Sequence, residues 1–138
     1  MKKLLSFSLM LTLLLALASC SLFGETGDVW ADAVYTEDTE LGSGEKAFTL
    51  ELEVEEHLVT FTVHTDEQTV GAALLALDFI SGEPGAYGLY VKVVNGMEAD
   101  YDKDQHYWSL LIDGEYAMSG VDSTEITEGT VYRLVYAK

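Results

Sequence analysis

The sequence contains very little cysteine, proline or positive charge. Its 138 residues include one Cys and one Pro, so an internal disulfide is excluded and the folded part must be held together by packing. Lys and Arg number 7 against 24 Asp and Glu, which gives a formal net charge of −17 at pH 7. A field of this sign repels nucleic acid and anionic lipid headgroups, so we exclude both as partners. It is compatible with a cationic partner, and solubility alone also explains it.

The N-terminus has the pattern of an export signal. Met1-Lys2-Lys3 is a short basic start, and residues 4–17 are almost entirely apolar. This run is shorter than the roughly 20 residues that a helix needs to cross a bilayer. Leu17-Ala18-Ser19-Cys20 resembles the lipobox of bacterial lipoproteins, which predicts cleavage before Cys20 and lipid attachment to its thiol. The alternative is a plain signal peptide with an incidental Cys.

These features predict three parts of the chain. Residues 1–19 are expected to be the lipoprotein signal peptide, and residues 20–46 an acidic tether that begins with the lipidated Cys20. Within the tether, residues 30–46 contain apolar side chains that suit an edge strand, namely Trp30, Val34 and Tyr35. Residues 47–138 have the usual size of one folded domain. We therefore expect a protein on the extracytoplasmic side of the cell membrane, held there by its lipid.

Apolar periodicity predicts the N-terminal half of the domain. Residues 48–54 and 59–64 alternate apolar with polar side chains, which indicates a β-hairpin with its turn at Glu56-His57. Thr65 to Gln68 fits a capping box, and the apolar spacing over residues 70–77 predicts a helix with one face on the sheet. Two breaking residues are expected to end this helix: Gly82 and Pro84.

The C-terminal half predicts four further strands around a polar loop at residues 97–106. These strands cover residues 89–93, 107–112, 115–118 and 131–136. Asp113-Gly114 is a favourable two-residue hairpin turn, and alternation places Tyr107 and Trp108 on opposite faces, with Trp108 partly buried. The expected fold is a single α+β domain with one helix packed on a mixed or antiparallel sheet, similar to a β-grasp.

Several short stretches then carry a family resemblance. They are Thr62-Val63-His64-Thr65, Tyr87-Gly88-Leu89-Tyr90-Val91, Val94-Asn95-Gly96, Asp100-Tyr101-Asp102, Tyr107-Trp108, Ile112-Asp113-Gly114-Glu115-Tyr116 and Gly120-Val121-Asp122. In this order they resemble the transcobalamin-C-terminal-like domain of many bacterial lipoproteins, catalogued as a domain of unknown function. The resemblance implies binding of cobalamin or a related corrinoid at one face. The helical domain that holds the other face in transcobalamin-like proteins has no counterpart in this sequence.

Aromatic residues are dense in the C-terminal half and suit a flat ligand or an interface, because Tyr and Trp are rigid and amphipathic. Together with the resemblance, they select the candidate ligand-binding residues Tyr87, Tyr90, Asn95, Tyr101, His106 and Trp108. His106 lies beside an acidic loop and is the histidine best placed to line a pocket. The alternative is that these aromatics belong to an ordinary core and its rim.

Alternating carboxylates at Asp100, Asp102 and Asp104 resemble an oxygen-ligand loop for a divalent cation such as Ca²⁺. An EF-hand is excluded, because Gln105 and Leu111 stand where its Gly and Glu would be. The alternative is a solvated acidic loop.

No nucleophile is paired with a His and an orienting acid, so we expect no enzyme. Three functions remain: capture of a small ligand, with a corrinoid favoured by the resemblance; binding of a divalent cation; and docking of an envelope protein. The loops at residues 83–88, 97–106 and 119–123 are expected to share one end of the sheet, which would serve any of the three.

Overall fold

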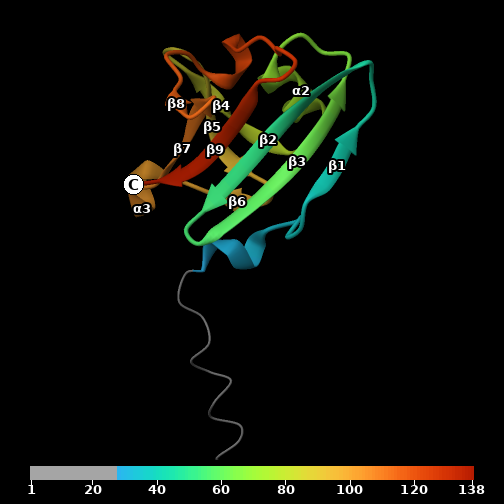
Figure 1. Cartoon of the computed structure of the whole chain (residues 1–138). Helices are drawn as coiled ribbons and strands as arrows, with labels where there is room; N and C mark the ends of the chain where they lie inside the picture. Colours follow the sequence, from blue (N-terminus) through green and yellow to red (C-terminus); the bar gives the residue numbers. More distant parts are fainter. Residues whose placement is uncertain (1–27) are drawn as a thin grey trace, which may run out of the picture.

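A six-stranded mixed sheet forms one layer of the structure. Its strands are β1 (Thr39–Gly42), β2 (Lys46–Val54), β3 (His57–Thr65), β7 (Tyr107–Ile112), β8 (Glu115–Tyr116) and β9 (Val131–Ala137). In the computed structural model, which describes residues 28–138, their order is β1-β3-β2-β9-β7-β8 (Figure 1). Two neighbouring pairs, β1 with β3 and β2 with β9, are parallel, and the others are antiparallel.

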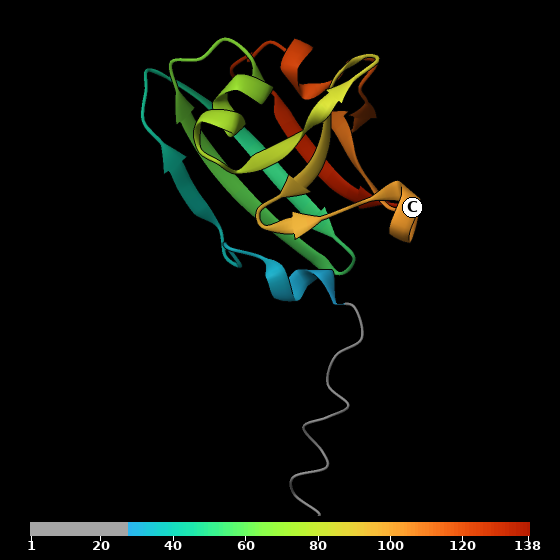
Figure 2. The ribbon, with the colours of Figure 1, turned by 180° about the vertical axis from the view of Figure 1, so that it is seen from behind.

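A second layer covers one face of this sheet. It consists of α2 (Val70–Ala76) and a three-stranded antiparallel sheet of β4 (Ile80–Gly85), β5 (Gly88–Val94) and β6 (Met97–Glu98). Figure 2 shows α2 and these strands lying in front of β2 and β3. The α+β class and the single domain are confirmed, whereas the one sheet expected from the sequence is divided into two.

The hydrophobic core lies between the two layers. The apolar positions of β2 and β3 are buried as their alternation predicts: Phe48, Leu50, Leu52, Val54, Val59, Phe61 and Val63. The turn between these strands is at Glu55-Glu56, one residue earlier than expected, and β3 begins at His57. Glu55 has a positive φ of 54°, so the chain makes this tight turn without the usual Asn or Gly.

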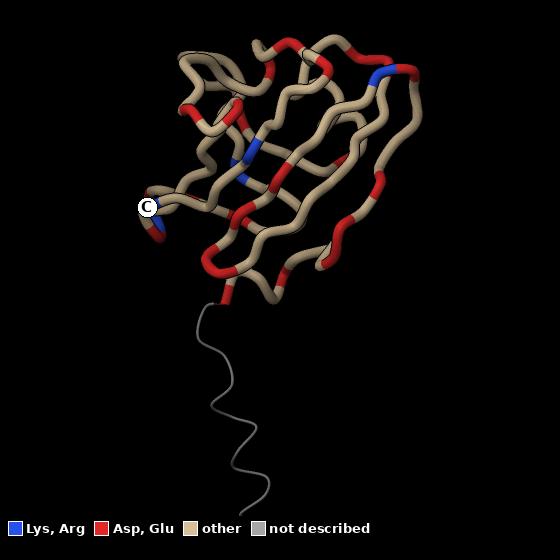
Figure 3. Tube along the Cα trace, viewed as in Figure 1, with Lys and Arg blue, Asp and Glu red and all other residues tan. Residues whose placement is uncertain are grey.

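The opposite face of the large sheet is polar. Arg133 on β9 reaches Glu51 on β2, with 2.8 Å between Nε and a carboxylate oxygen. Figure 3 shows Asp and Glu distributed around the fold, with few Lys or Arg among them. This solvated face needs no second layer, which explains why only one side of the sheet is covered.

Helix α2 starts later than the capping-box pattern predicts. Its N-cap is Thr69, whose side chain accepts a hydrogen bond from the Ala72 amide at 3.1 Å. Thr65 accepts instead from the Glu67 amide at 3.0 Å, still within the turn that precedes the helix. The predicted capping box is therefore wrong, although the helix and its buried face are confirmed.

Gly82 and Pro84 do not end this helix, which stops before them at Ala76; they lie in strand β4. β4 is the outer strand of the small sheet, where a proline without an N–H can be accommodated. The ladder shifts register between Ser81 and Gly82, so this strand carries a bulge. Edge position and bulge together hide it from a sequence pattern.

The segment 97–106 is also more structured than the expected polar loop. It contains β6 and a short helix, α3 (Tyr101–Asp104). The strand at Tyr107–Ile112 and the turn at Asp113-Gly114 are confirmed, and both turn residues have positive φ, at 49° and 85°. Trp108 is buried and Tyr107 is exposed on the other face, as alternation predicts.

The N-terminal part of the described chain packs under the domain. It forms a 3-10 helix, η2 (Val29–Asp32), and then strand β1, which lies at the edge of the large sheet. Trp30 lies in η2, where its ring stacks on His57, and β1 starts only at Thr39. The predicted signal peptide and the lipidation at Cys20 lie outside the described residues. No helix within residues 28–138 has the length and apolar character to cross a membrane.

Candidate ligand-binding surface

Four large side chains on β5, on β8 and on the turns next to them are exposed to solvent. Tyr87 is 94% exposed, Tyr116 75% and Met118 102%, while Tyr90 is 40% exposed. We call these four residues the aromatic patch. Exposed apolar side chains gathered in one place commonly mark a binding surface, whereas isolated ones need no explanation.

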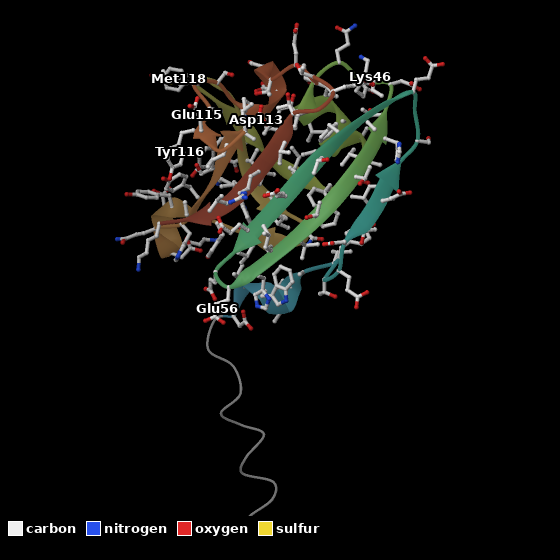
Figure 4. The ribbon with its side chains drawn as sticks, viewed as in Figure 1. Lys46, Glu56, Asp113, Glu115, Tyr116 and Met118 are labelled. Carbon is white, nitrogen blue, oxygen red and sulfur yellow. The ribbon has the colours of Figure 1, made fainter. Side chains whose placement is uncertain are left out.

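Three segments bring the aromatic patch together. Tyr87 lies in the turn between β4 and β5, and Tyr116 and Met118 follow the Asp113-Gly114 turn (Figure 4). The Leu89 amide donates to a carboxylate oxygen of Asp122 at 3.1 Å, which ties the β4–β5 turn to the loop containing the short helix η3 (Val121–Ser123). This hydrogen bond holds the backbone beneath part of the patch in place.

A recess of ≈ 180 Å³ lies between β5 and the β7–β8 hairpin. Tyr90 and Tyr116 lie on its rim, and Trp108 and Leu110 line it from β7. Trp108 also joins the two sheets, because its indole Nε1 donates to the Lys92 carbonyl at 3.1 Å. The recess is thus the seam between the sheets.

One ion pair borders this region. Lys92 Nζ is 3.3 Å from a carboxylate oxygen of Glu83, and Glu83 stands opposite Tyr90 in the β4–β5 ladder. The hydrogen bond to Glu83 raises the pKa of the Lys92 ammonium. The ammonium is therefore charged at neutral pH, and Glu83 compensates it.

His106 lies in a different place, at an acidic hollow near η2. Its ring stacks on Tyr136 with centroids 4.3 Å apart, and the hollow of ≈ 370 Å³ also includes Asp32, Glu98 and Asp104. His106 Nδ1 is buried without a hydrogen-bond partner among the described residues and lies 3.7 Å from an Asp104 oxygen. Burial, followed by Asp104, raises the pKa of Tyr136.

The carboxylates of the expected cation loop are used to build α3. Asp100 caps this helix by accepting from the Asp102 amide at 3.1 Å, and Asp104 accepts from the His106 amide at 2.8 Å. Within residues 28–138, no group of three or more His, Cys, Asp or Glu is arranged to hold a metal ion. The structure therefore does not assemble Asp100, Asp102 and Asp104 into a cation site.

Asn95 and Tyr101 do not join the aromatic patch. Asn95 is 2% exposed, and its side-chain amide is occupied by the backbone of Tyr35, so it does not face a ligand. Tyr101 lies on α3, 56% exposed, with its ring edge-on to Tyr107. Of the six candidate ligand residues, Tyr90 and Trp108 line the recess, and Tyr87 lies in the turn just before β5.

The three loops expected at one end of the sheet are divided between two. Residues 83–88 and 119–123 adjoin each other through Asp122, whereas residues 97–106 lie beside η2. Figure 1 shows β4, β8 and the segment after β8 far from the point where the described chain begins. Two members of the patch, Tyr116 and Met118, were not among the candidate ligand residues predicted from the sequence. Tyr116 belongs to the strand after the Asp113-Gly114 turn, and Met118 follows it. Their position after an Asp-Gly hairpin turn is the signal that exposes them.

Comparison with known families identifies the domain. The family described as a domain of unknown function (DUF4430) matches residues 67–136. The chain belongs to the DUF4430 family. This match confirms the resemblance to a catalogued domain of unknown function, and no curated protein matches the sequence.

Two solved structures are similar to this DUF4430 domain, and the first of them supports its fold. A "putative metal binding protein" from Ruminococcus gnavus is 27% identical with a TM-score of 0.63, over 68% of this chain and 98% of that one. Haptocorrin in complex with Cbi is 20% identical with a TM-score of 0.47, over 71% of this chain and 27% of that one.

Proposed function

We propose that this domain captures a small flat ligand outside the cytoplasmic membrane and does no chemistry on it. The observation that carries the proposal is the aromatic patch, in which Tyr87, Tyr116 and Met118 are each at least 75% exposed. Leaving such side chains in solvent has no benefit for folding, because burying each would contribute about 1.5–3 kcal/mol. A ligand that covers them recovers that free energy.

The shape of the surface favours a ligand that lies across it. The recess beneath Tyr90 and Tyr116 is ≈ 180 Å³, below the roughly 300–1,000 Å³ of pockets that enclose a drug-sized molecule. A planar ligand would stack on the tyrosine rings while an edge group enters the recess. A corrinoid is the first candidate, because it is broad and flat and because the sequence resembles transcobalamin-like domains.

Calorimetric titration of the chain with hydroxocobalamin tests this proposal. We expect a saturable heat of binding with the unaltered chain. The affinity should fall at least about tenfold in a Tyr87→Ala, Tyr116→Ala variant, since aromatic contacts dominate such surfaces. Tyr101→Ala is the matched control, because Tyr101 is also an exposed tyrosine but lies on α3. Equal loss in the control, or no heat from the unaltered chain, would contradict corrinoid capture and favour an envelope protein as the partner.

Binding of a divalent cation is the second candidate. Its support is the likeness to the Ruminococcus gnavus protein described as metal binding. If the acidic segment binds Ca²⁺, the melting temperature of the chain should rise with Ca²⁺ and the rise should vanish in an Asp102→Asn, Asp104→Asn variant. A rise that survives both substitutions would place the cation elsewhere, and no rise would exclude Ca²⁺ as the ligand.

We also propose that Cys20 carries the lipid that holds the domain at the membrane. Several acyl chains on one residue would anchor the chain firmly, because each buried CH₂ contributes about 0.8 kcal/mol. A Cys20→Ser variant should therefore leave the membrane fraction, while a Ser21→Ala variant stays in it. Retention of the Cys20→Ser chain in the membrane would refute lipid anchoring at this residue.

A further inference from the structure

A second hollow lies beside the aromatic patch and is chemically different from it. It has a volume of ≈ 440 Å³ and is bounded by the end of β7, by η3 and by the segment that leads into β9. This volume is within the range of pockets that take small organic molecules. Ser119 lines both this hollow and the recess under Tyr116, so the two adjoin. We call it the hydroxyl recess.

Hydroxyl groups dominate its wall. Ser119, Ser123 and Thr127 are exposed and Thr130 is half-buried, and no hydrogen bond joins any of their hydroxyls to another residue within 28–138. Thr124 is the contrasting neighbour, because its hydroxyl donates to the Gly120 carbonyl at 2.8 Å. Four hydroxyls in one concave wall are therefore free to bond a ligand.

The wall is held in place from beneath. The buried Tyr132 hydroxyl donates to the Glu125 carbonyl and accepts from the Thr127 amide, each at 2.9 Å. The Ile126 amide donates to the Gln68 carbonyl at 3.0 Å, which fixes the same segment to the start of α2. A pre-formed wall reduces the conformational entropy that a ligand must overcome.

The composition of the recess selects a class of ligand. Its lining contains no Lys or Arg and one carboxylate, Glu125, so an anion such as a phosphate would be repelled. An apolar ligand would leave the hydroxyls desolvated and without partners, at a cost of about 1–3 kcal/mol each. The half-buried Ile112 offers an apolar surface between these polar groups. A neutral molecule with many hydroxyls and an apolar face satisfies all of these conditions.

We propose that the hydroxyl recess binds a neutral saccharide. The free hydroxyls and Glu125 bond the hydroxyls of one sugar ring, whose C–H face lies on Ile112. The adjoining recess lets a longer glycan continue past Tyr116, whose exposed ring suits stacking on the next sugar. The hydroxyl recess itself contains no residue of the aromatic patch, and only a longer glycan would share Tyr116 with the proposed corrinoid surface.

Chemical-shift perturbation of the backbone amides, measured by nuclear magnetic resonance, tests the proposal. The sample is the full chain in a detergent without a sugar headgroup. The probes are maltotetraose, cellotetraose and chitotetraose, titrated separately to about 10 mM, since wet, open sites bind with about millimolar affinity. We expect at least one of them to shift the amides of residues 119–130 saturably. Silence from all three, or shifts confined to other residues, would overturn the proposal.

Substitutions then separate the hydroxyls from the shape of the site. A Thr127→Val, Thr130→Val variant keeps the side-chain volume and should weaken binding at least about tenfold, because two hydrogen bonds are lost. The matched control is Thr60→Val, Thr62→Val on the outer face of β3, which should leave affinity unchanged. Unchanged affinity in the first variant, with the folded spectrum retained, would overturn the role of the hydroxyls. Hydroxocobalamin titration of the same variants reports on the aromatic patch separately.

Discussion

Replacing Asn95 by Ala should detach the N-terminal segment from the domain. Asn95 Nδ2 donates to the Tyr35 carbonyl and Asn95 Oδ1 accepts from the Tyr35 amide, each at 2.9 Å. The Asn95 carbonyl also accepts from the Val34 amide at 3.0 Å. Asn95 thus bonds this segment as a neighbouring strand would, and does so from a turn residue that is 2% exposed.

The magnitude follows from two separate terms. Losing both side-chain hydrogen bonds should cost about 1–3 kcal/mol, at about 0.5–1.5 kcal/mol for each. Asn95 also has a positive φ of 51°, a conformation that Asn tolerates better than Ala, which adds about 1 kcal/mol. We therefore expect Asn95→Ala to lower the free energy of unfolding by about 2–4 kcal/mol.

Urea denaturation measures this loss, and hydrogen exchange shows where it acts. The amides of Val34 and Tyr35 should exchange faster in the variant, because their acceptors are removed or displaced. Asn95→Gly is the matched control: it removes the same side chain but tolerates positive φ, so its loss should be about 1 kcal/mol smaller. A loss below about 0.5 kcal/mol in Asn95→Ala would refute the reasoning.

Three further substitutions test other parts of the structure. Trp108→Phe should lower the free energy of unfolding, measured in urea, by about 1 kcal/mol, because the hydrogen bond from the indole to the Lys92 carbonyl is lost. The loss is limited, because this carbonyl still accepts from the Ala99 amide at 2.8 Å. An unchanged midpoint would contradict a stabilising hydrogen bond between the two sheets. Burial raises the folded-state pKa of Tyr136 above 10.0, so the contribution of this group to stability is present below that pH and is lost as pH rises through the raised value. Tyr136→Phe should therefore flatten the fall in melting temperature at high pH. An unaltered dependence of the melting temperature on pH would contradict the raised pKa. Gly88→Ala should cost about 1–3 kcal/mol in urea, because φ is +106° and a Cβ would lie 2.7 Å from a carboxylate oxygen, so a neutral result would show that the turn relaxes.

The elements that the sequence predicts well are those whose burial alternates regularly. In β2 and β3 every second residue is buried in the core, so the alternation around Leu50 and Phe61 predicts which face of each strand is buried. The Asp113-Gly114 turn is equally local, because two residues with positive φ suffice to define it. Local rules of this kind require no knowledge of what the element packs against.

The missed elements depend on their neighbours in space. Pro84 is acceptable in β4 only because this strand is at the edge of the small sheet. Asp100 and Asp104 resemble cation ligands in sequence, but their oxygens accept amide hydrogens around α3. Backbone amides a few residues away compete with a cation for these carboxylate oxygens. The spacing of the carboxylates alone does not show whether the amides or a cation will bind them.

The candidate site, like the fold, was predicted from the sequence only in part. Tyr87 and Tyr90 were predicted because aromatic residues are dense in this part of the sequence. Tyr90 borders the recess between the two sheets, and Tyr87 lies in the adjoining turn. His106 belonged to the same set, yet the fold places it beside η2 in the acidic hollow. His106 and Trp108 both pack against Tyr136, with ring centroids 4.3 and 5.3 Å from it, yet Trp108 lines the recess and His106 the acidic hollow.

The position of η2 bears on how a ligand would reach the domain. The described chain begins at Asp28, beside η2 and the acidic hollow, whereas β4 and β8, the elements next to the aromatic patch, lie toward the far end (Figure 1). If Cys20 carries the proposed lipid, eight residues of the sequence separate it from Val29 at the start of η2, and the η2 end of the domain would then be the end nearer the membrane. The exposed tyrosines are therefore better placed to meet a ligand arriving from outside than to insert into the bilayer.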